Sequence, residues 1–340
     1  MLAVSIRVGG ERHVQVSAGR RPGMDVAEAS ERCGAVIDAV DEVVTADRSL
    51  FETILVGVLS RGHVLLEDVP GTGKTLTARA IAAALNLEFS RVQFTPDLLP
   101  TDVLGTDVYN ERDRTFEFNR GPIFANVVLA DEINRAPPKT QAALLEAMEE
   151  EQVTVDGTTH ELPDPFLVIA TQNPVEQEGT FQLPEAQIDR FVVKTSIGYP
   201  TETGEIDLLR RRAGRVERSP TIGAVLSHDQ VRDLRVIPED VRVDGDVVEY
   251  VVALARATRE DRRVRIGVSP RGTQRLFEAA RSRAVIAGRD YVTPDDVKRV
   301  ARPTLAHRLV LTADATVDDV RKTDVVADVL NTIPVPTVER

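Results

Sequence analysis

The stretch from Glu67 to Thr75 constrains this chain more than any other feature of its sequence. It reads Glu-Asp-Val-Pro-Gly-Thr-Gly-Lys-Thr and lies between a short apolar run, His63–Leu66, and an Ala-rich segment with a helical pattern, Thr75–Leu85. A strand, a Gly-rich loop and a helix in this order form a phosphate loop. Its glycines let backbone N–H groups surround a triphosphate, and the helix N-terminus adds positive potential. The sequence therefore predicts a nucleoside triphosphate site on an α/β fold.

Within the loop, Lys74 is expected to reach the β- and γ-phosphates, and the Thr75 hydroxyl to bind magnesium. The loop departs from the full pattern at Asp68, where glycine is usual; Asp tolerates unusual backbone angles, but the direction of its carboxylate is open. A Gly-rich turn without a ligand is the alternative interpretation. The predicted nucleotide contacts are Asp68, Val69, Pro70, Gly71, Thr72, Gly73, Lys74, Thr75 and Leu76.

Short apolar runs separated by helical patterns predict a parallel sheet with helices on both faces. With His63–Leu66, the expected strands are Phe89–Phe94, Val127–Ala130, Phe166–Ala170 and Phe191–Val193. After Pro200 the pattern becomes helical, and Thr293-Pro294-Asp295-Asp296 is a strong helix start because Thr can cap and Pro suits the first helical position. We expect a mobile tail (1–26), an α/β nucleotide-binding domain (27–200), and a linker with a small helical domain (201–340). A basic docking arm is the alternative for the tail.

Composition narrows the class of protein. The chain has 340 residues, 42% of them hydrophobic, and a net charge of −12, which argues against a nucleic-acid groove as its main surface. The single cysteine, Cys33, excludes an internal disulfide and a Cys-based zinc site. No apolar run approaches the ~20 residues of a membrane span, and the first residues lack the apolar core of a signal peptide. We expect a cytoplasmic protein without a membrane span.

Polar residues end two of the expected strands. Asp131 and Glu132 follow Val127–Ala130, and Asn173 follows Phe166–Ala170. Strand ends at one edge of a parallel sheet converge on a ligand crevice. We expect Asp131 to hold magnesium through its water shell, Glu132 to act as general base and Asn173 to orient water. The alternatives are a strand running into a loop for the acidic pair and a turn cap before Pro174 for Asn173.

The order of these motifs resembles that of the AAA+ ATPases and, among them, the MoxR family. The resemblance covers nearly all of residues 30–325. It is carried by Glu67–Thr75, Ala130-Asp131-Glu132-Ile133-Asn134-Arg135-Ala136-Pro137, Ala170-Thr171-Gln172-Asn173-Pro174, Leu183-Pro184-Glu185-Ala186-Gln187-Ile188-Asp189-Arg190-Phe191 and Ser269-Pro270-Arg271.

The resemblance implies a five-stranded AAA+ domain followed by a small all-α lid, with ATP and Mg²⁺ as ligands. Asn173 would be the first sensor residue, and Arg190 an arginine finger acting on ATP in the neighbouring subunit. Arg271 would be the second sensor, reaching the γ-phosphate of its own subunit. A finger acting in trans implies a homo-oligomer, usually a ring of six. Arg135 would be a further interface residue or part of a structural salt bridge.

Two expected hairpins, one within Asp97–Pro122 and one at Gln152–Thr159 with an Asp-Gly turn, fit the same resemblance. In related ring ATPases such hairpins face the pore or a client protein; hairpins without contacts are the alternative. His63, His160 and His307 show no ligand spacing and are interpreted as structural.

Three functions remain open from the sequence. The first is a chaperone-like ATPase that remodels or activates partner proteins, often with von Willebrand factor A domains. The second is the motor subunit of a metal chelatase, which shares many of these motifs. The third is a non-hydrolysing, nucleotide-gated assembly module, for which Asp68 is the only support. A helicase role fits least, because the chain is acidic and shows no cluster of aromatic residues for base stacking.

Overall fold

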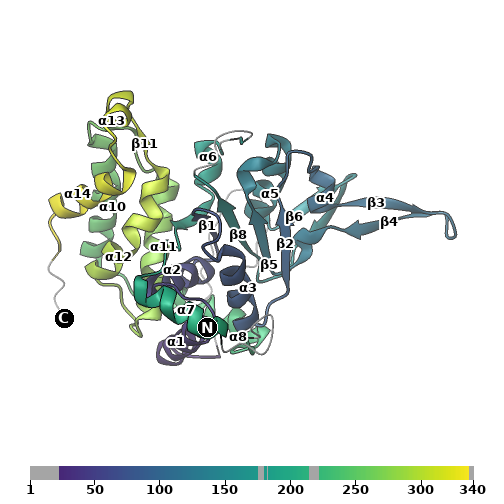
Figure 1. The fold of residues 1–340 in the computed structure, drawn as a ribbon. Helices are drawn as coiled ribbons and strands as arrows, with labels where there is room; N and C mark the ends of the chain where they lie inside the picture. The colour runs from purple at the N-terminus through teal and green to yellow at the C-terminus, as the bar shows by residue number, and fades with distance from the viewer. Residues whose placement is uncertain (1–22, 175–179, 182, 214–221, 337–340) are drawn as a thin grey trace, which may run out of the picture.

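The computed structural model describes residues 23–174, 180–181, 183–213 and 222–336. Its centre is a five-stranded parallel sheet with the strand order β2-β5-β8-β1-β9 (Figure 1), which confirms the predicted fold class. The strands are β1 (His63–Glu67), β2 (Phe89–Gln93), β5 (Val127–Asp131), β8 (Leu167–Gln172) and β9 (Phe191–Thr195).

Helices cover both faces of this sheet because its strands are apolar on both sides. Val64 and Leu66 of β1 pack into one core cluster with the first three helices, whereas Leu65 packs into the other cluster with α5. The helices of this part are α1 (Val26–Asp41), α2 (Arg48–Leu59), α3 (Lys74–Ala84), α4 (Pro100–Leu104), α5 (Pro138–Glu150) and α6 (Glu185–Ile188), with the 3-10 turns η1 (Pro122–Phe124) and η2 (Ile133–Arg135).

The amino-terminal part of the fold begins earlier than the expected boundary at residue 26. Met24 is buried, and the Asp25 side chain caps α1 by accepting a hydrogen bond from the backbone N–H of Glu28. The expected tail otherwise lies outside the described residues. The helical pattern from Ala27 to Ser60 is two helices, since the chain turns after α1 and Asp47 caps the start of α2.

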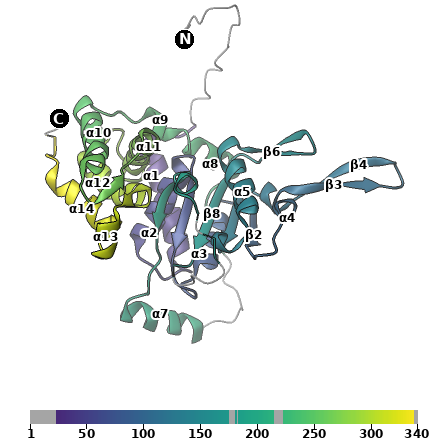
Figure 2. The same cartoon turned by 90° about the horizontal axis from the view of Figure 1, so that it is seen from above.

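Two antiparallel hairpins project from the sheet domain on the same side (Figure 2), as the sequence predicts. In the second hairpin, Asp156 and Gly157 both have positive φ, the backbone that a tight two-residue turn requires. The bases of the hairpins touch, because the ring of Phe118 stacks on that of His160 with centroids 3.9 Å apart. Their strands are β3 (Gly105–Asn110), β4 (Thr115–Arg120), β6 (Gln152–Val155) and β7 (Thr158–Glu161).

The rest of the described chain is mainly helical, and Thr293 caps α12 with a reciprocal hydrogen bond to Asp296 as the sequence predicts. A short antiparallel pair, β10 with β11, adds strands that the expected all-α lid lacks. The elements are α7 (Glu202–Ala213), α8 (His228–Leu234), α9 (Ile237–Asp240), α10 (Gly245–Glu260), β10 (Val264–Ile266), α11 (Pro270–Ile286), α12 (Pro294–Leu305), η3 (Ala306–Arg308), β11 (Val310–Leu311), α13 (Ala313–Val317) and α14 (Lys322–Thr332).

The lid is fixed to the edge of the sheet by the buried side chain of Arg308, which is 2% exposed. Its guanidinium donates to the carboxylate of Asp189 at 2.7 Å and to the carbonyl oxygen of Phe191 at 2.7 Å. Burial lowers the pKa of Arg308 to about 10, while Asp189 acts in the opposite direction, so the side chain is charged at neutral pH. Lid helices and α1 to α3 also share one apolar cluster. The lid therefore holds a defined position against the strand that follows Arg190.

Replacing Arg308 tests this anchor. We expect Arg308→Met to lower the free energy of unfolding by about 3–5 kcal/mol, because it leaves the carboxylate of Asp189 without its buried partner. Arg321→Met is the matched control: Arg321 and Asp324 form an exposed pair, whose loss should cost less than about 1 kcal/mol. Chemical denaturation followed by circular dichroism measures both. Equal effects of the two substitutions would contradict the assignment of Arg308 as the anchor.

Candidate nucleotide site at the carboxyl edge of the sheet

The phosphate loop joins β1 to α3 with the backbone that its sequence predicts. Gly71 and Gly73 have φ of 85° and 93°, a conformation that side chains with a Cβ rarely adopt. Gly73 is the residue immediately before α3, so the free N–H groups of that helix face the loop. The Lys74 ammonium donates to the carbonyl oxygens of Asp68 and Val69 at 2.6 and 2.9 Å. The loop therefore holds a cation and a helix N-terminus together, which suits a polyphosphate.

The Asp68 carboxylate is bound to backbone N–H groups, and this answers the question that the sequence leaves open. One oxygen accepts from the N–H of Val69 at 2.9 Å. The other accepts from Ile197 at 2.8 Å and from Gly198 at 2.7 Å. The side chain is buried, and it ties the loop to the segment after β9. Asp68 therefore acts as a structural link.

The acidic pair at the end of β5 is held by a threonine of the neighbouring strand. The Thr171 hydroxyl donates to Asp131 at 2.6 Å and accepts from the backbone N–H of Glu132 at 2.8 Å. This second bond supports Glu132 in the left-handed region, with φ of 57°. Thr171 thereby fixes the relative positions of the two carboxylates, a role that the sequence analysis did not assign.

Strand β2 supplies two further partners that the sequence analysis missed. Arg91 donates twice to one oxygen of Asp131, at 3.0 and 2.7 Å. The Gln93 amide donates at 2.7 Å to Oε2 of Glu132, and Arg135 donates to the same oxygen at 2.9 Å. In the described part of the chain, Oε1 of Glu132 accepts no hydrogen bond, so this oxygen can accept one from a water molecule. The ion pair of Arg135 with Glu132 matches the expectation that Arg135 forms a structural salt bridge.

The strand order brings the predicted polar residues to one edge. The phosphate loop follows β1, Asn173 follows β8 and Asp131 ends β5, and these three strands are neighbours in the parallel sheet. Asn173 is buried there. Carboxyl ends of parallel strands share an edge, so the loop, the acidic pair and the amide face a common crevice.

The oxygens at this edge fit magnesium. Thr75 and Asp131 offer a hydroxyl and a carboxylate, the hard ligands that Mg²⁺ prefers. Oδ1 of Asp131 accepts one hydrogen bond, from Thr171, and keeps a second lone pair, whereas Oδ2 already accepts two from Arg91. The described residues contain no group of three or more His, Cys, Asp or Glu that could hold a metal ion by itself. An ion that keeps several waters and binds mainly to substrate phosphates needs no such group.

The two predicted arginines lie together, but not at this edge. Glu149, at the end of α5, accepts from Arg271 at 2.6 Å and forms an ion pair with Arg190 at 3.2 Å. Arg190 directly precedes β9. The preceding residue of α5, Met148, shares a hydrogen bond of 2.9 Å through its carbonyl oxygen with the ring of His63, the first residue of β1. Glu149 and both arginines therefore lie near the amino ends of the strands.

This position differs from the one expected for Arg271, at the γ-phosphate of its own subunit, and that expected role stays a prediction. The phosphate loop follows the last residue of β1, and Glu149 lies near the first. A strand of this length separates its ends by roughly 13 Å, at about 3.3 Å per residue. Within one subunit, the lid residue Arg271 binds Glu149 at this amino end, a contact that the sequence pattern did not predict. Sequence reasoning had no signal for Glu149, because it lies in an ordinary acidic run at a helix end.

The histidines are structural, as expected. Burial lowers the pKa of His63 to about 4, and its Nδ1 accepts from the backbone N–H of Val168 at 3.0 Å. Burial and the neighbouring Arg308 lower the pKa of His307 well below its usual value, and its ring bonds to the carbonyl oxygen of Phe191. His160 stacks on Phe118.

Comparison with known proteins agrees with this arrangement. Residues 63–193 match the "ATPase family associated with various cellular activities (AAA)", and residues 256–329 match an "AAA lid domain". The chain is 44% identical over 308 residues to "Chaperone MoxR1" of Mycobacterium tuberculosis, covering 88% of this chain and 81% of that protein. The chain belongs to the MoxR family of AAA+ ATPases.

Two further matches extend over most of the chain. "Protein MoxR" of Methylorubrum extorquens is 32% identical over 328 residues, covering 86% of this chain and 92% of that protein. A crystal structure of a putative ATPase from Cytophaga hutchinsonii has a TM-score of 0.85 and 38% identity, and the match covers 92% of this chain and 97% of that one. The MoxR match is thus much broader than that to the "Aerobic cobaltochelatase subunit CobS" of a Sinorhizobium species, which is 27% identical and covers 52% of this chain.

Replacing Asp68 with the usual glycine tests its structural role. If the carboxylate repelled phosphates, Asp68→Gly would tighten ATP binding. We expect weaker binding instead, together with a loss of about 1–3 kcal/mol in the free energy of unfolding, because the N–H groups of Ile197 and Gly198 lose a buried acceptor. Binding of a fluorescent ATP analogue and chemical denaturation measure the two effects. The control is Asp97→Gly, which removes an exposed acidic residue beyond β2. Tighter binding by the Asp68 variant alone would contradict this role.

Proposed function

We propose that this chain hydrolyses ATP with magnesium in a homo-oligomeric ring, at sites formed between neighbouring subunits. One observation carries the proposal: the phosphate loop and the arginines lie at opposite edges of the same sheet. A single subunit therefore cannot bring Arg190 to its own Lys74. A second copy, presenting its amino edge to the carboxyl edge of the first, supplies the missing cations. Six subunits, the number usual in the family, is part of the proposal.

In the proposed site, the loop residues and Lys74 hold the triphosphate. Glu132 orients the attacking water and accepts its proton, and Asn173 positions this water against the γ-phosphate. Thr75 and Asp131 would hold magnesium, which supplies charge neutralisation between the β- and γ-phosphates when bound. Arg190 and Arg271 of the neighbour stabilise the charge that develops in the transition state.

Glu149 must release Arg190 and Arg271 before these arginines can act on ATP in the neighbouring subunit. It neutralises Arg190 and Arg271 within one subunit, and both arginines lower the pKa of Glu149, Arg271 by its hydrogen bond first. The arginines must exchange Glu149 for phosphate oxygens when the neighbour binds ATP. Hydrolysis then depends on assembly, because an isolated subunit keeps these cations on its own carboxylate.

The work that this ATPase performs is proposed to be remodelling or activation of a partner protein. The relative named a chaperone supports this role. The first hairpin presents the exposed side chains of Tyr109 and Phe116, and such apolar surface at a tip suits contact with a client. A partner with a von Willebrand factor A domain is the proposed client class. If so, a gene for such a protein should lie beside this one, and the purified partner should stimulate ATP hydrolysis.

The other functions are less well supported. A chelatase motor would share the nucleotide site, but the match to CobS spans only about half of the chain. The non-hydrolysing module loses its only sequence support, because the Asp68 carboxylate accepts hydrogen bonds from the backbone N–H groups of Ile197 and Gly198.

No helix among the described residues combines the length and apolar character needed to cross a membrane. A cytoplasmic location and the lack of a nucleic-acid partner stay predictions.

Steady-state ATP hydrolysis against protein concentration tests the proposal. We expect magnesium-dependent turnover whose rate per subunit rises with concentration as sites form between subunits. Glu132→Gln and Arg190→Ala should each lower kcat by about 10³-fold or more, the size of effect known for such groups. Arg135→Gln is a control for general disturbance near Glu132 and should retain more activity. A rate per subunit independent of concentration, down to the monomer, would contradict a shared site.

Mixing variants decides whether Arg271 acts on the neighbour. A subunit with Arg271→Ala keeps Glu132, and a subunit with Glu132→Gln keeps Arg271. If Arg271 acts in trans, mixing these two inactive proteins restores activity at interfaces where the Glu132→Gln subunit donates its arginine. Restoration by Arg190→Ala mixed with Glu132→Gln is the positive control. Activity in that control mixture but none in the Arg271 mixture would place Arg271 on its own subunit's ATP.

A further inference from the structure

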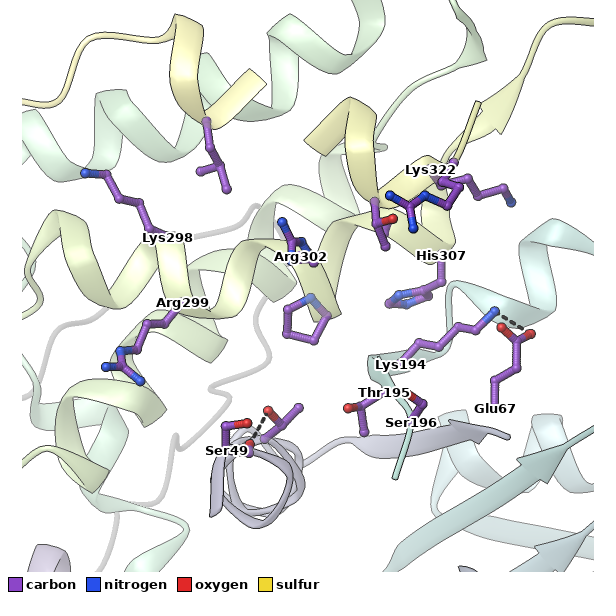
Figure 3. A pocket seen from close by; sticks show the side chains of 16 residues that line it. Ser49, Glu67, Lys194, Thr195, Ser196, Lys298, Arg299, Arg302, His307 and Lys322 are labelled. Atoms are coloured by element: carbon purple, nitrogen blue, oxygen red, sulfur yellow. Dashed lines mark hydrogen bonds and ion pairs between the residues drawn. The ribbon is translucent and has the colours of Figure 1, made fainter. Parts of the chain in front are cut away.

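A second cavity lies where the lid meets the edge of the sheet, and it differs from the nucleotide crevice. Its volume is about 640 Å³, within the range of small-molecule sites. The core contributes α2 and the end of β9, and the lid contributes α12, η3 and the start of α14 (Figure 3). None of the predicted nucleotide contacts 68–76 lines this cavity. Of the residues that do line it, only Glu67 is adjacent to those contacts in sequence.

The lining is strongly cationic although the chain as a whole carries a net charge of −12. Glu67 is the single acidic residue among those that line the cavity. Such a concentration of positive charge in a concave site focuses the field on an anionic ligand. The cationic lining residues are Lys194, Lys298, Arg299, Arg302, Arg321 and Lys322.

Half of these cations have acidic partners, and half do not. Lys194 pairs with Glu67 at 2.7 Å, Lys298 with Asp295 at 3.7 Å, and Arg321 with Asp324 at 2.8 Å. Among the described residues, the side chains of Arg299, Arg302 and Lys322 have no ion pair or hydrogen bond. Burial and the nearby charge of Lys194 lower the pKa of Lys322, as expected where cations gather without enough counter-charge.

Other groups in the lining suit phosphate oxygens. Ser49 lies in the first turn of α2 and Thr323 in the first turn of α14, so both helices direct their positive ends toward the cavity. Hydroxyls of Thr195 and Ser196 add donors from the core side. Pro303 and Leu330 give an apolar portion, so the cavity combines charge, donors and apolar surface.

We propose that this lid–core cavity binds a small molecule carrying two or more phosphate groups, held by Arg299, Arg302 and Lys322 from the lid and by Lys194 from the core. The ligand would join the two parts of the chain across their contact. It would also compete with Glu67 for Lys194, as Figure 3 shows Lys194 extended toward that carboxylate. Because Glu67 directly precedes Asp68, releasing Glu67 from Lys194 would change the contacts at the start of the phosphate loop.

Titration calorimetry with sodium tripolyphosphate tests this site, using the full chain with Lys74→Ala in magnesium-free buffer. The substitution weakens the phosphate loop, so remaining binding reports the second cavity, whether or not the protein hydrolyses ATP. We expect saturable binding, weakened at least about tenfold by Arg299→Gln with Arg302→Gln, a loss of about 1.4 kcal/mol. Lys322→Gln alone, from a different helix, should weaken it in the same direction.

The matched control is Arg256→Gln with Arg262→Gln, which removes the same charge from the lid outside the cavity. It should change the affinity by less than about twofold, and thermal unfolding of each variant checks that it is folded. No saturable binding, or equal weakening by both pairs, would overturn the site. So would orthophosphate binding as tightly as tripolyphosphate.

A comparison of probes separates two sources of the phosphate groups. ATP binding with the same affinity as tripolyphosphate would support recognition of the phosphate chain alone. Tighter ATP binding that is also lost in the Arg299 and Arg302 variant would support a nucleotide as the ligand. ATP binding unaffected by these substitutions would assign the signal to the phosphate loop and contradict the proposal.

Discussion

The two edges of one parallel sheet govern how this chain can act. All strands of the central sheet point the same way, so groups after a strand and groups before it lie apart by the length of the strand. Lys74, Asp131 and Asn173 follow strands or end them, whereas Arg190 precedes one. The fold therefore divides the charges that a triphosphate needs between opposite edges. Assembly of subunits is the direct way to reunite them, which links catalysis to oligomerisation through geometry.

The docked lid adds a further positive charge, that of Arg271, to the amino edge of the sheet. Arg308 is buried against Asp189 and the start of β9, and this contact holds the lid against the strand next to which Glu149 binds Arg271. The same docking creates the cationic cavity between α12, α14 and β9. The buried arginine contact and the shared apolar cluster together account for the lid's position, the grouping of Arg190 with Arg271, and the second cavity.

The sequence predicts features that depend on local pattern and cannot predict those that depend on docking. The apolar strands, the Asp156-Gly157 turn and the Thr293 cap are local, and the structure confirms them. The direction of the Asp68 carboxylate depends on Ile197 and Gly198, which lie far along the chain. Gln93 became a partner of Glu132 only through the order of strands. The cis role expected for Arg271 stays a prediction; in this structure Arg271 binds Glu149, a contact that depends on how the lid docks.

A structure of the assembled Glu132→Gln protein with ATP and magnesium tests the shared site most directly. The substitution slows hydrolysis, so the triphosphate stays intact. The account predicts that Arg190 and Arg271 of one subunit have left Glu149 and lie within hydrogen-bond distance, about 3 Å, of the γ-phosphate held by Lys74 of the next. A γ-phosphate bound by Arg271 of its own subunit, or both arginines still paired with Glu149 in the ATP-bound ring, would contradict it.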